Sequence, residues 1–248
     1  VANAQQLVIV VAAANPEPRT GFIDRAVVAA FDAGIEPILC ITKTDVRHPQ
    51  NLLDYYAASG LKIVLSSSSD GLAPSQEGAK GLESAPVQEL LQELLGQVSV
   101  LLGHSGVGKS TLVNALTGSE RATGHVNAVT GRGRHTSSSA LALRPVNANG
   151  EPMEPGTWII DTPGIRSFGL AHVPPETVVE AFVDLAPGAA DCPKACTHAA
   201  QAPECGLEAY VAAGHAGKSG PARLESLRKL LLLTPEESDS EKELGALV

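Results

Sequence analysis

The chain has 248 residues, of which 44% are hydrophobic and only 3% are aromatic. That length suits one α/β domain with a small appendage, and the core must consist mainly of Val, Leu, Ile and Ala. A formal net charge of −9 argues against a simple nucleic-acid coat protein, although it is compatible with a local basic patch. No apolar run approaches the roughly 18 residues that span a bilayer, and no secretory signal pattern is present. We therefore expect a cytoplasmic protein.

Strand-like and helix-like segments alternate through the first part of the chain. Continuous apolar runs typical of buried strands occupy residues 6–14, 37–42 and 61–66, and helical spacing occupies residues 22–33 and 51–59. This alternation predicts an α/β fold with a mostly parallel sheet and helices on its faces.

The rest of the chain is less regular. Residues 67–86 and 119–139 are polar and Gly-rich and indicate surface loops, and residues 234–248 indicate a frayed acidic tail. Helical fragments are expected from residue 176 onward. Further helices are predicted at residues 87–95, 109–117 and 222–233, and further strands at residues 98–102, 141–146 and 157–160, the last two paired. We divide the chain into a first domain at residues 1–173 and a small C-terminal helical domain at residues 174–248.

A phosphate-binding loop follows the strand predicted at residues 98–102. Residues 103–110 match G-x-x-x-x-G-K-[ST] at every fixed position, and a helix-forming segment follows. Its glycines let backbone N–H groups approach phosphate oxygens, and the helix N-terminus adds a positive dipole. Lys109 is expected to reach the β- and γ-phosphates and Ser110 to bind Mg²⁺. The alternative is a Gly-rich turn that binds nothing. The predicted contacts are Gly103, His104, Ser105, Gly106, Val107, Gly108, Lys109, Ser110 and Thr111, with His104 expected to be exposed rather than catalytic.

A second magnesium motif, Asp-Thr-Pro-Gly, ends the strand predicted at residues 157–160. Asp161 fits a water-mediated contact to Mg²⁺, and Gly164 offers a backbone N–H to the γ-phosphate. A D-x-x-G pattern alone usually marks a turn, but its place about fifty residues after the phosphate loop favours the nucleotide site. Many GTPases carry Gln at the next position to orient water, whereas this chain has Ile165, so slow intrinsic hydrolysis is expected.

A guanine-recognition motif precedes the phosphate loop. Thr42-Lys43-Thr44-Asp45 is similar to N-K-x-D, with Thr in place of Asn. The Asp45 carboxylate accepts two hydrogen bonds from a guanine edge that adenine lacks, and the Lys43 stem packs along the base. Ser66, Ser67 and Ser68 match the loop whose backbone reads guanine O6. A T-K-x-D tetrapeptide is common on surfaces, but both segments follow apolar strands. The reversed motif order is tolerated because parallel sheets assemble sites at the carboxyl ends of their strands.

A cysteine and histidine cluster lies in the C-terminal part. Cys192, Cys196, His198 and Cys205 form C-x₃-C-x-H-x₆-C. Three thiolates and one imidazole suit a tetrahedral Zn²⁺ ion, and the closed ligand set favours a structural ion without a catalytic water. The alternative is a set of unligated cysteines. Cys40 lies in a predicted strand and is expected to be a core residue.

Taken together, these motifs resemble the circularly permuted GTPases called ribosome small subunit-dependent GTPase A, over about residues 1–233. The resemblance implies a GTPase that is stimulated by the small ribosomal subunit and acts in its late maturation. It implies GTP or GDP, Mg²⁺ and one structural Zn²⁺ as cofactors, and the subunit and its rRNA as partners of a monomer. The family normally carries an N-terminal OB-fold domain, which we expect to be missing here. It also has four residues between the first two cysteines, whereas this chain has three.

The resemblance also assigns a switch motif at residues 133–137, Gly-Arg-His-Thr-Ser. Thr136 is the expected Mg²⁺ ligand, with Ser137 as the alternative, and His135 is a candidate to orient the attacking water. The alternative for His135 is a solvated loop histidine. Lys218, Arg223, Arg228 and Lys229 would meet rRNA phosphates from one helix face, or form an ordinary solvated face.

Two other functions remain open from the residues. The chain is either an enzyme with these catalytic groups, namely Lys109, His135 and Thr136, or a nucleotide-gated rRNA-binding module whose turnover is incidental. The third hypothesis is an ATPase. It predicts that Asp45→Asn leaves the choice between ATP and GTP unchanged.

Overall fold

The computed structural model describes residues 3–67, 85–118, 140–147, 149–163 and 169–232. The loops predicted across residues 68–84 and 119–139 and the tail from residue 233 lie outside the described residues. The described chain packs into two compact units. The first draws its described residues from Val1–Arg19, Gly34–Pro49 and Lys62–Arg166, and the second from Thr20–Ala33, Gln50–Leu61 and Ser167–Val248. The boundary at residue 173 divides the chain by sequence and stays a prediction.

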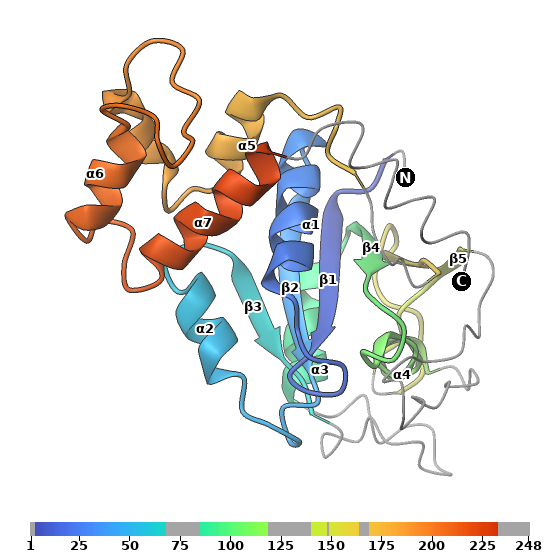
Figure 1. Ribbon diagram of the computed structural model, residues 1–248. Coiled ribbons are helices and arrows are strands. Elements are labelled where there is room, and N and C mark those ends of the chain that lie inside the picture. The colour runs from blue at the N-terminus through green and yellow to red at the C-terminus, as the bar shows by residue number, and fades with distance from the viewer. Residues whose placement is uncertain (1–2, 68–84, 119–139, 148, 164–168, 233–248) are drawn as a thin grey trace, which may run out of the picture. The chain divides into compact units, whose positions relative to one another are not determined.

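The first unit contains a mixed sheet with strand order β3-β2-β1-β4-β6-β5 (Figure 1). β1 pairs in parallel with β2 on one side and β4 on the other, β3 and β6 extend the parallel arrangement, and β5 pairs antiparallel to β6 at the edge. The predicted parallel sheet and the predicted pairing of the last two strands are both present. The strands are β1 (Gln6–Ala12), β2 (Glu36–Thr42), β3 (Lys62–Leu65), β4 (Val98–Leu102), β5 (Leu141–Leu143) and β6 (Trp158–Asp161).

Two helices of this unit, α3 (Ala85–Leu94) and α4 (Lys109–Thr117), share one core with the sheet. In α3, Val87, Leu90, Leu91 and Leu94 recur at the spacing of one helix face and are all buried. Alternate residues of each strand meet them, because side chains of a strand point to opposite faces in turn. The sheet side of the core consists of Val8, Val10, Ala12, Ile38, Cys40, Val64, Leu101 and Ile159.

The second unit is helical. It contains α1 (Thr20–Asp32), α2 (Gln50–Tyr56), α5 (Pro175–Ala181), the short 3₁₀ helix η3 (Ala186–Asp191), α6 (Gly206–Ala212) and α7 (Gly220–Leu231). Its apolar core joins Val28 of α1 to Phe182, Leu185 and Leu207. Leu224, Leu227 and Leu230 of α7 complete that core at helical spacing. The predicted helical fragments after residue 176 are therefore packed around one centre.

Candidate functional site

Residues 103–108 connect β4 to α4 at the carboxyl end of the sheet. Gly106 and Gly108 have φ values of 84° and 94°, in the left-handed region that glycine tolerates best. At Gly103 a Cβ atom would lie 2.6 Å from the carbonyl oxygen of Val10 on β1. The glycines of the motif are therefore required by the backbone path itself, and Ser110 and Thr111 lie in the first turn of α4.

Lys109 and Asp161 form a buried ion pair at this end of the sheet. The Lys109 ammonium donates to an Asp161 carboxylate oxygen and to the carbonyl oxygen of Thr162. Lys109 is only 7% exposed and Asp161 only 2%. The hydroxyl of Thr162 donates to the Leu101 carbonyl oxygen on β4 at 2.6 Å and so ties the end of β6 to its neighbour. The structure thus places the cationic and anionic groups of the two predicted motifs against each other.

The T-K-x-D segment contacts the phosphate loop directly. The Lys43 ammonium donates to the carbonyl oxygen of Gly106 at 2.8 Å. The Thr42 hydroxyl lies within hydrogen-bonding distance of the carbonyl oxygens of Val107 and, at 3.2 Å, of Val11. Thr42 is only 4% exposed, so its side chain lies between strands and not on the surface. The T-K-x-D segment and the phosphate loop, more than sixty residues apart in the chain, are therefore in direct contact. We call the continuous structure formed by residues 42–45 and 103–110 the wall.

The serine loop follows β3 and is attached to the same wall. The backbone N–H and hydroxyl of Thr44 donate to the Ser66 carbonyl oxygen at 3.1 and 3.0 Å. Ser66 and Ser67 are buried, whereas Asp45 is exposed. Burial lowers the pKa of Lys43, and the nearby negative charge of Asp45 opposes that effect. Asp45 is therefore an exposed residue beside Lys43.

The loop after β1 also contributes to this wall, which the sequence analysis missed. The Lys43 ammonium also donates to the Asn15 carbonyl oxygen. Arg47 donates from Nε to the Ala13 carbonyl oxygen at 3.0 Å and pairs with Glu17 at 2.6 Å. The sequence pattern predicted only that a strand ends near residue 14. Since neighbouring parallel strands end at the same edge, the loop after β1 was detectable once β1 was placed beside β4.

Five predicted nucleotide-site residues lie outside the described residues: Ser68, His135, Thr136, Ser137 and Gly164. Among those described, His104 differs from its expectation because it is half-buried and not exposed. Burial, followed by the charge of Arg19, lowers the pKa of His104. Both causes favour the neutral imidazole of His104.

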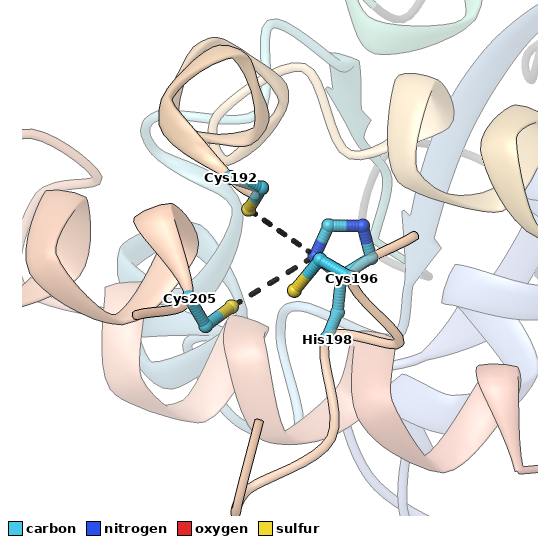
Figure 2. A group of neighbouring side chains, drawn as sticks. All are labelled: Cys192, Cys196, His198 and Cys205. Atoms are coloured by element: carbon cyan, nitrogen blue, oxygen red, sulfur yellow. Dashed lines mark hydrogen bonds between the residues drawn. The ribbon is translucent and has the colours of Figure 1, made fainter. Parts of the chain in front are cut away.

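The three cysteines and the histidine of the C-terminal cluster converge on one point (Figure 2). Their four ligand atoms lie within 4.8 Å of one another. The His198 Nδ1 atom is 3.6 Å from the Cys192 sulfur and 3.8 Å from the Cys205 sulfur. A tetrahedral Zn²⁺ with bonds of about 2.3 Å to sulfur and about 2.0 Å to nitrogen separates those atoms by about 3.5 Å. The donor set and its spacing therefore fit Zn²⁺ through Nδ1.

Neighbouring groups support these ligands. The Gly206 N–H donates to the Cys192 sulfur at 3.2 Å, an interaction that favours a thiolate. Burial, followed by the charge of Arg228, lowers the pKa of His198, and neutral imidazole is the form that binds metal. Cys40, by contrast, is fully buried in β2, and burial raises its pKa to about 12. Cys40 is thus an inert core residue, as predicted.

The family model described as RsgA GTPase matches residues 1–171, which is more than half of the chain. The chain belongs to the RsgA GTPase family. Proteins called small ribosomal subunit biogenesis GTPase RsgA, from Pseudomonas aeruginosa (strain LESB58) and Azotobacter vinelandii (strain DJ), are 36% and 37% identical to it over 95% of this chain. The chain spans 64% and 63% of the length of these two RsgA proteins.

Solved structures agree with the RsgA assignment. The crystal structure of YjeQ from Thermotoga maritima is similar with a TM-score of 0.65 and 26% identity, covering 94% of this chain and 73% of that one. YloQ, whose crystal structure is described as that of a circularly permuted GTPase, is similar with a TM-score of 0.61 and 22% identity, covering 92% and 68%. The predicted circularly permuted GTPase fold is therefore confirmed.

One prediction about the C-terminal part of the chain was wrong. Arg223 does not lie on an exposed basic face, because it is only 3% exposed and pairs with Asp184 and Asp24 at 2.8 and 2.6 Å. Arg228 is also engaged within the unit, with Glu208, and Lys229 pairs with Glu225 along the same helix. α7 therefore does not present the predicted row of basic side chains to rRNA.

Among the helices that the structure describes, none combines the length and the apolar character needed to cross a membrane.

Proposed function

We propose that this chain binds a guanine nucleotide along the wall formed by the T-K-x-D segment and the phosphate loop, and hydrolyses GTP there. The observation that carries the proposal is the hydrogen bond from Lys43 to the Gly106 carbonyl oxygen. It supports a single site in which base and phosphate recognition are joined although their order in the chain is reversed. The ATPase alternative has no comparable support, because adenine lacks the edge that Asp45 would bind.

Each side chain has a role that follows from its contacts. Asp45, open to solvent beside Lys43, would accept the guanine N–H groups. Lys109 would exchange its contact with Asp161 for the β- and γ-phosphates, and Asp161 would then turn toward Mg²⁺, which Ser110 would also bind. Bound Mg²⁺ would supply neutralisation of the charge on the phosphates. The backbone N–H groups of residues 103–110 would hold the same oxygens.

The switch residues complete the proposed site. Thr136, or Ser137 in its place, would bind Mg²⁺, Gly164 would donate its N–H to the γ-phosphate, and His135 would orient the attacking water. Ile165 follows Gly164, where many GTPases have Gln, and its side chain cannot hold a water molecule. We therefore expect slow hydrolysis until a partner orders the switch residues.

The proposed partner is the small ribosomal subunit. The RsgA relatives carry that subunit in their name, which supports a role for this chain in late maturation of the 30S subunit through contacts with its rRNA. The chain would act in the cytoplasm, as a monomer. We also propose that Cys192, Cys196, His198 and Cys205 hold one structural Zn²⁺ ion, for which their spacing is the support.

GTP hydrolysis should be measured with purified small subunits, with large subunits and with neither. We expect slow turnover alone and a large rise with small subunits only. Equal rates in all three reactions would contradict a subunit-dependent GTPase. If GTP-dependent binding to small subunits persists without any stimulation, the chain is instead a nucleotide-gated rRNA-binding module.

Lys109→Ala tests the nucleotide site itself, with Lys62→Ala as the matched control. Lys62 pairs with Glu93 at the amino end of β3, so its replacement removes the same charge away from the site. Losing a charged hydrogen bond costs about 1.5–3 kcal/mol, or about 10- to 150-fold in GTP affinity. Equal GTP affinities for the two variants would exclude Lys109 from phosphate binding.

A further inference from the structure

Arg228 of α7 joins two parts of the metal-ligand segment. Its Nε donates to the backbone carbonyl oxygen of His198 at 2.9 Å. Its Nη2 donates to a carboxylate oxygen of Glu208 at 2.5 Å. Glu208 lies in the first turn of α6, and its N–H donates to the carbonyl oxygen of the ligand Cys205 at 3.1 Å. One guanidinium therefore contacts the backbone of one ligand and the helix turn that begins at another.

His198 needs such an anchor because of its backbone. Its φ is 56°, in the left-handed region that residues with a Cβ seldom adopt. The direction of its ring, and so the place of Nδ1 opposite the cysteine sulfurs in Figure 2, depends on holding that conformation. The Arg228 bond to the carbonyl oxygen of His198 acts on the peptide group that follows the ring-bearing residue.

The surroundings of Arg228 indicate a built contact and not a chance surface pair. The Arg228 side chain is 17% exposed, whereas the next residue, Lys229, is 70% exposed and pairs along its own helix with Glu225. An arginine offers donors in a rigid planar fork, so it holds two acceptors in fixed positions, which a lysine ammonium does not.

We infer that Arg228 is a positioning residue of the Cys192–Cys196–His198–Cys205 metal site, which it serves without contacting the metal. This inference rests on the proposed Zn²⁺ site and extends it to the residues around the ligands. Groups that orient metal ligands from outside typically change metal affinity by about 10- to 100-fold when they are replaced.

The test compares Zn²⁺ affinity, by competition with a chromophoric chelator, in the full chain and three variants. Arg228→Met should weaken Zn²⁺ binding by about 10- to 100-fold. Arg228→Lys keeps the charge and should give a smaller loss, together with a shifted ligand-field absorption band in the Co²⁺-loaded protein. Lys229→Met removes the same charge one residue away and should match the unmodified chain in both measurements.

The outcomes separate the inference from the metal site on which it rests. If the unmodified chain does not bind Zn²⁺, the metal site itself is wrong. If it binds Zn²⁺ and Arg228→Met retains the affinity of Lys229→Met, the positioning role of Arg228 is wrong. Should Arg228→Met fail to fold, the Co²⁺ spectrum of Arg228→Lys decides, because an unchanged band would contradict the role.

Discussion

At position 42, threonine stands where the guanine motif of many GTPases has asparagine. The sequence suggested a nucleotide contact, but the structure buries the side chain between strands, with its hydroxyl next to the Val107 and Val11 carbonyl oxygens. The Thr42 side chain therefore contacts the phosphate loop at a backbone carbonyl oxygen of that loop. The Thr42 hydroxyl thus joins the end of β2 to the loop that connects β4 and α4.

Replacing Thr42 with Val tests that connection. Val has nearly the same shape but cannot donate, so the buried carbonyl oxygens lose a partner, which costs about 1–3 kcal/mol in unfolding free energy. We expect weaker GTP binding as well, because the phosphate loop is less firmly held. Urea unfolding and GTP titration measure the two effects.

Thr42→Ser is the control for this prediction. It keeps the hydroxyl and loses one methyl group, worth about 0.8 kcal/mol when buried, so GTP affinity should be nearly unchanged. If Ser and Val weaken GTP binding equally, the hydroxyl is not the group that matters.

Residue partners were the part of the site that the sequence predicted least well. The spacing of basic residues in α7 indicated an exposed face, yet the Arg223 guanidinium is bonded to Asp24, 199 positions away in the chain. A helical pattern reports which residues share a face but not which distant carboxylate meets that face. The motif residues were predictable because their chemistry is local to one turn. The contact of Arg47 with Ala13 was not, because it depends on strand order.

At the level of elements, α6 and η3 approach each other through two glycines. A Cβ at Gly206 would lie 2.4 Å from the Gly188 carbonyl oxygen, and a Cβ at Gly188 would lie 2.6 Å from the Tyr210 Cβ. Neither contact is possible without moving backbone. These elements span only six and seven residues, too few for a helical period to mark their boundaries, whereas the regular spacing of the longer α3 made that helix easy to predict.

Gly206→Ala should therefore separate α6 from η3. Overpacking of this kind costs about 1–3 kcal/mol, and the Gly206 N–H bond to the Cys192 sulfur should weaken with it. Thermal unfolding of the Zn²⁺-loaded chain measures the loss. Gly21→Ala in α1 is the control, since no atom lies within 4 Å of its added Cβ, and equal melting temperatures for the two variants would contradict the prediction.

The ion cluster that joins α1 to α7 should make stability depend on pH. Burial raises the pKa of Asp24 above its ordinary value of 3.8, and the charge of Arg223 only partly opposes this. The folded state then binds this proton more tightly than the unfolded state does. The stability that Asp24 contributes is present below pH 3.8 and is lost as the pH rises through the raised pKa.

Asp24→Asn isolates this effect because Asn does not titrate. We expect the unfolding free energy of the unmodified chain, minus that of the variant, to fall as the pH rises from 4 to 8. Urea unfolding at several pH values, with excess Zn²⁺ present, measures this difference. A difference that is constant would show that Asp24 ionises equally readily in both states, and one that rises with pH would show that it ionises more readily in the folded chain. Either result would contradict the prediction.

For the whole molecule, the permuted order of the motifs was readable because the sheet follows general rules. Parallel strands bring their carboxyl ends to one edge, so T-K-x-D before the phosphate loop was compatible with a single site. The division into two packed units was harder to foresee. The helices α1 and α2 belong by packing to the C-terminal unit although they lie between strands in the chain, and their apolar faces do not reveal which core they join.

The two units have separate apolar cores. The residues proposed to bind the nucleotide all belong to the first unit, and those proposed to bind Zn²⁺ all belong to the second. Removal of Zn²⁺ by a chelator should therefore increase amide hydrogen exchange in η3 and α6, where Cys192 and Cys205 lie at helix ends, and leave β1, β2 and β4 protected. GDP should have the complementary effect and protect the backbone of residues 103–110. Ligand binding stabilises the structure that holds the ligand by mass action, so each ligand should act mainly on its own unit.

Hydrogen exchange followed by mass spectrometry resolves both segments in one experiment. Equal loss of protection in the sheet and in α6 on chelation would mean that the two cores unfold together and that the metal stabilises the whole chain.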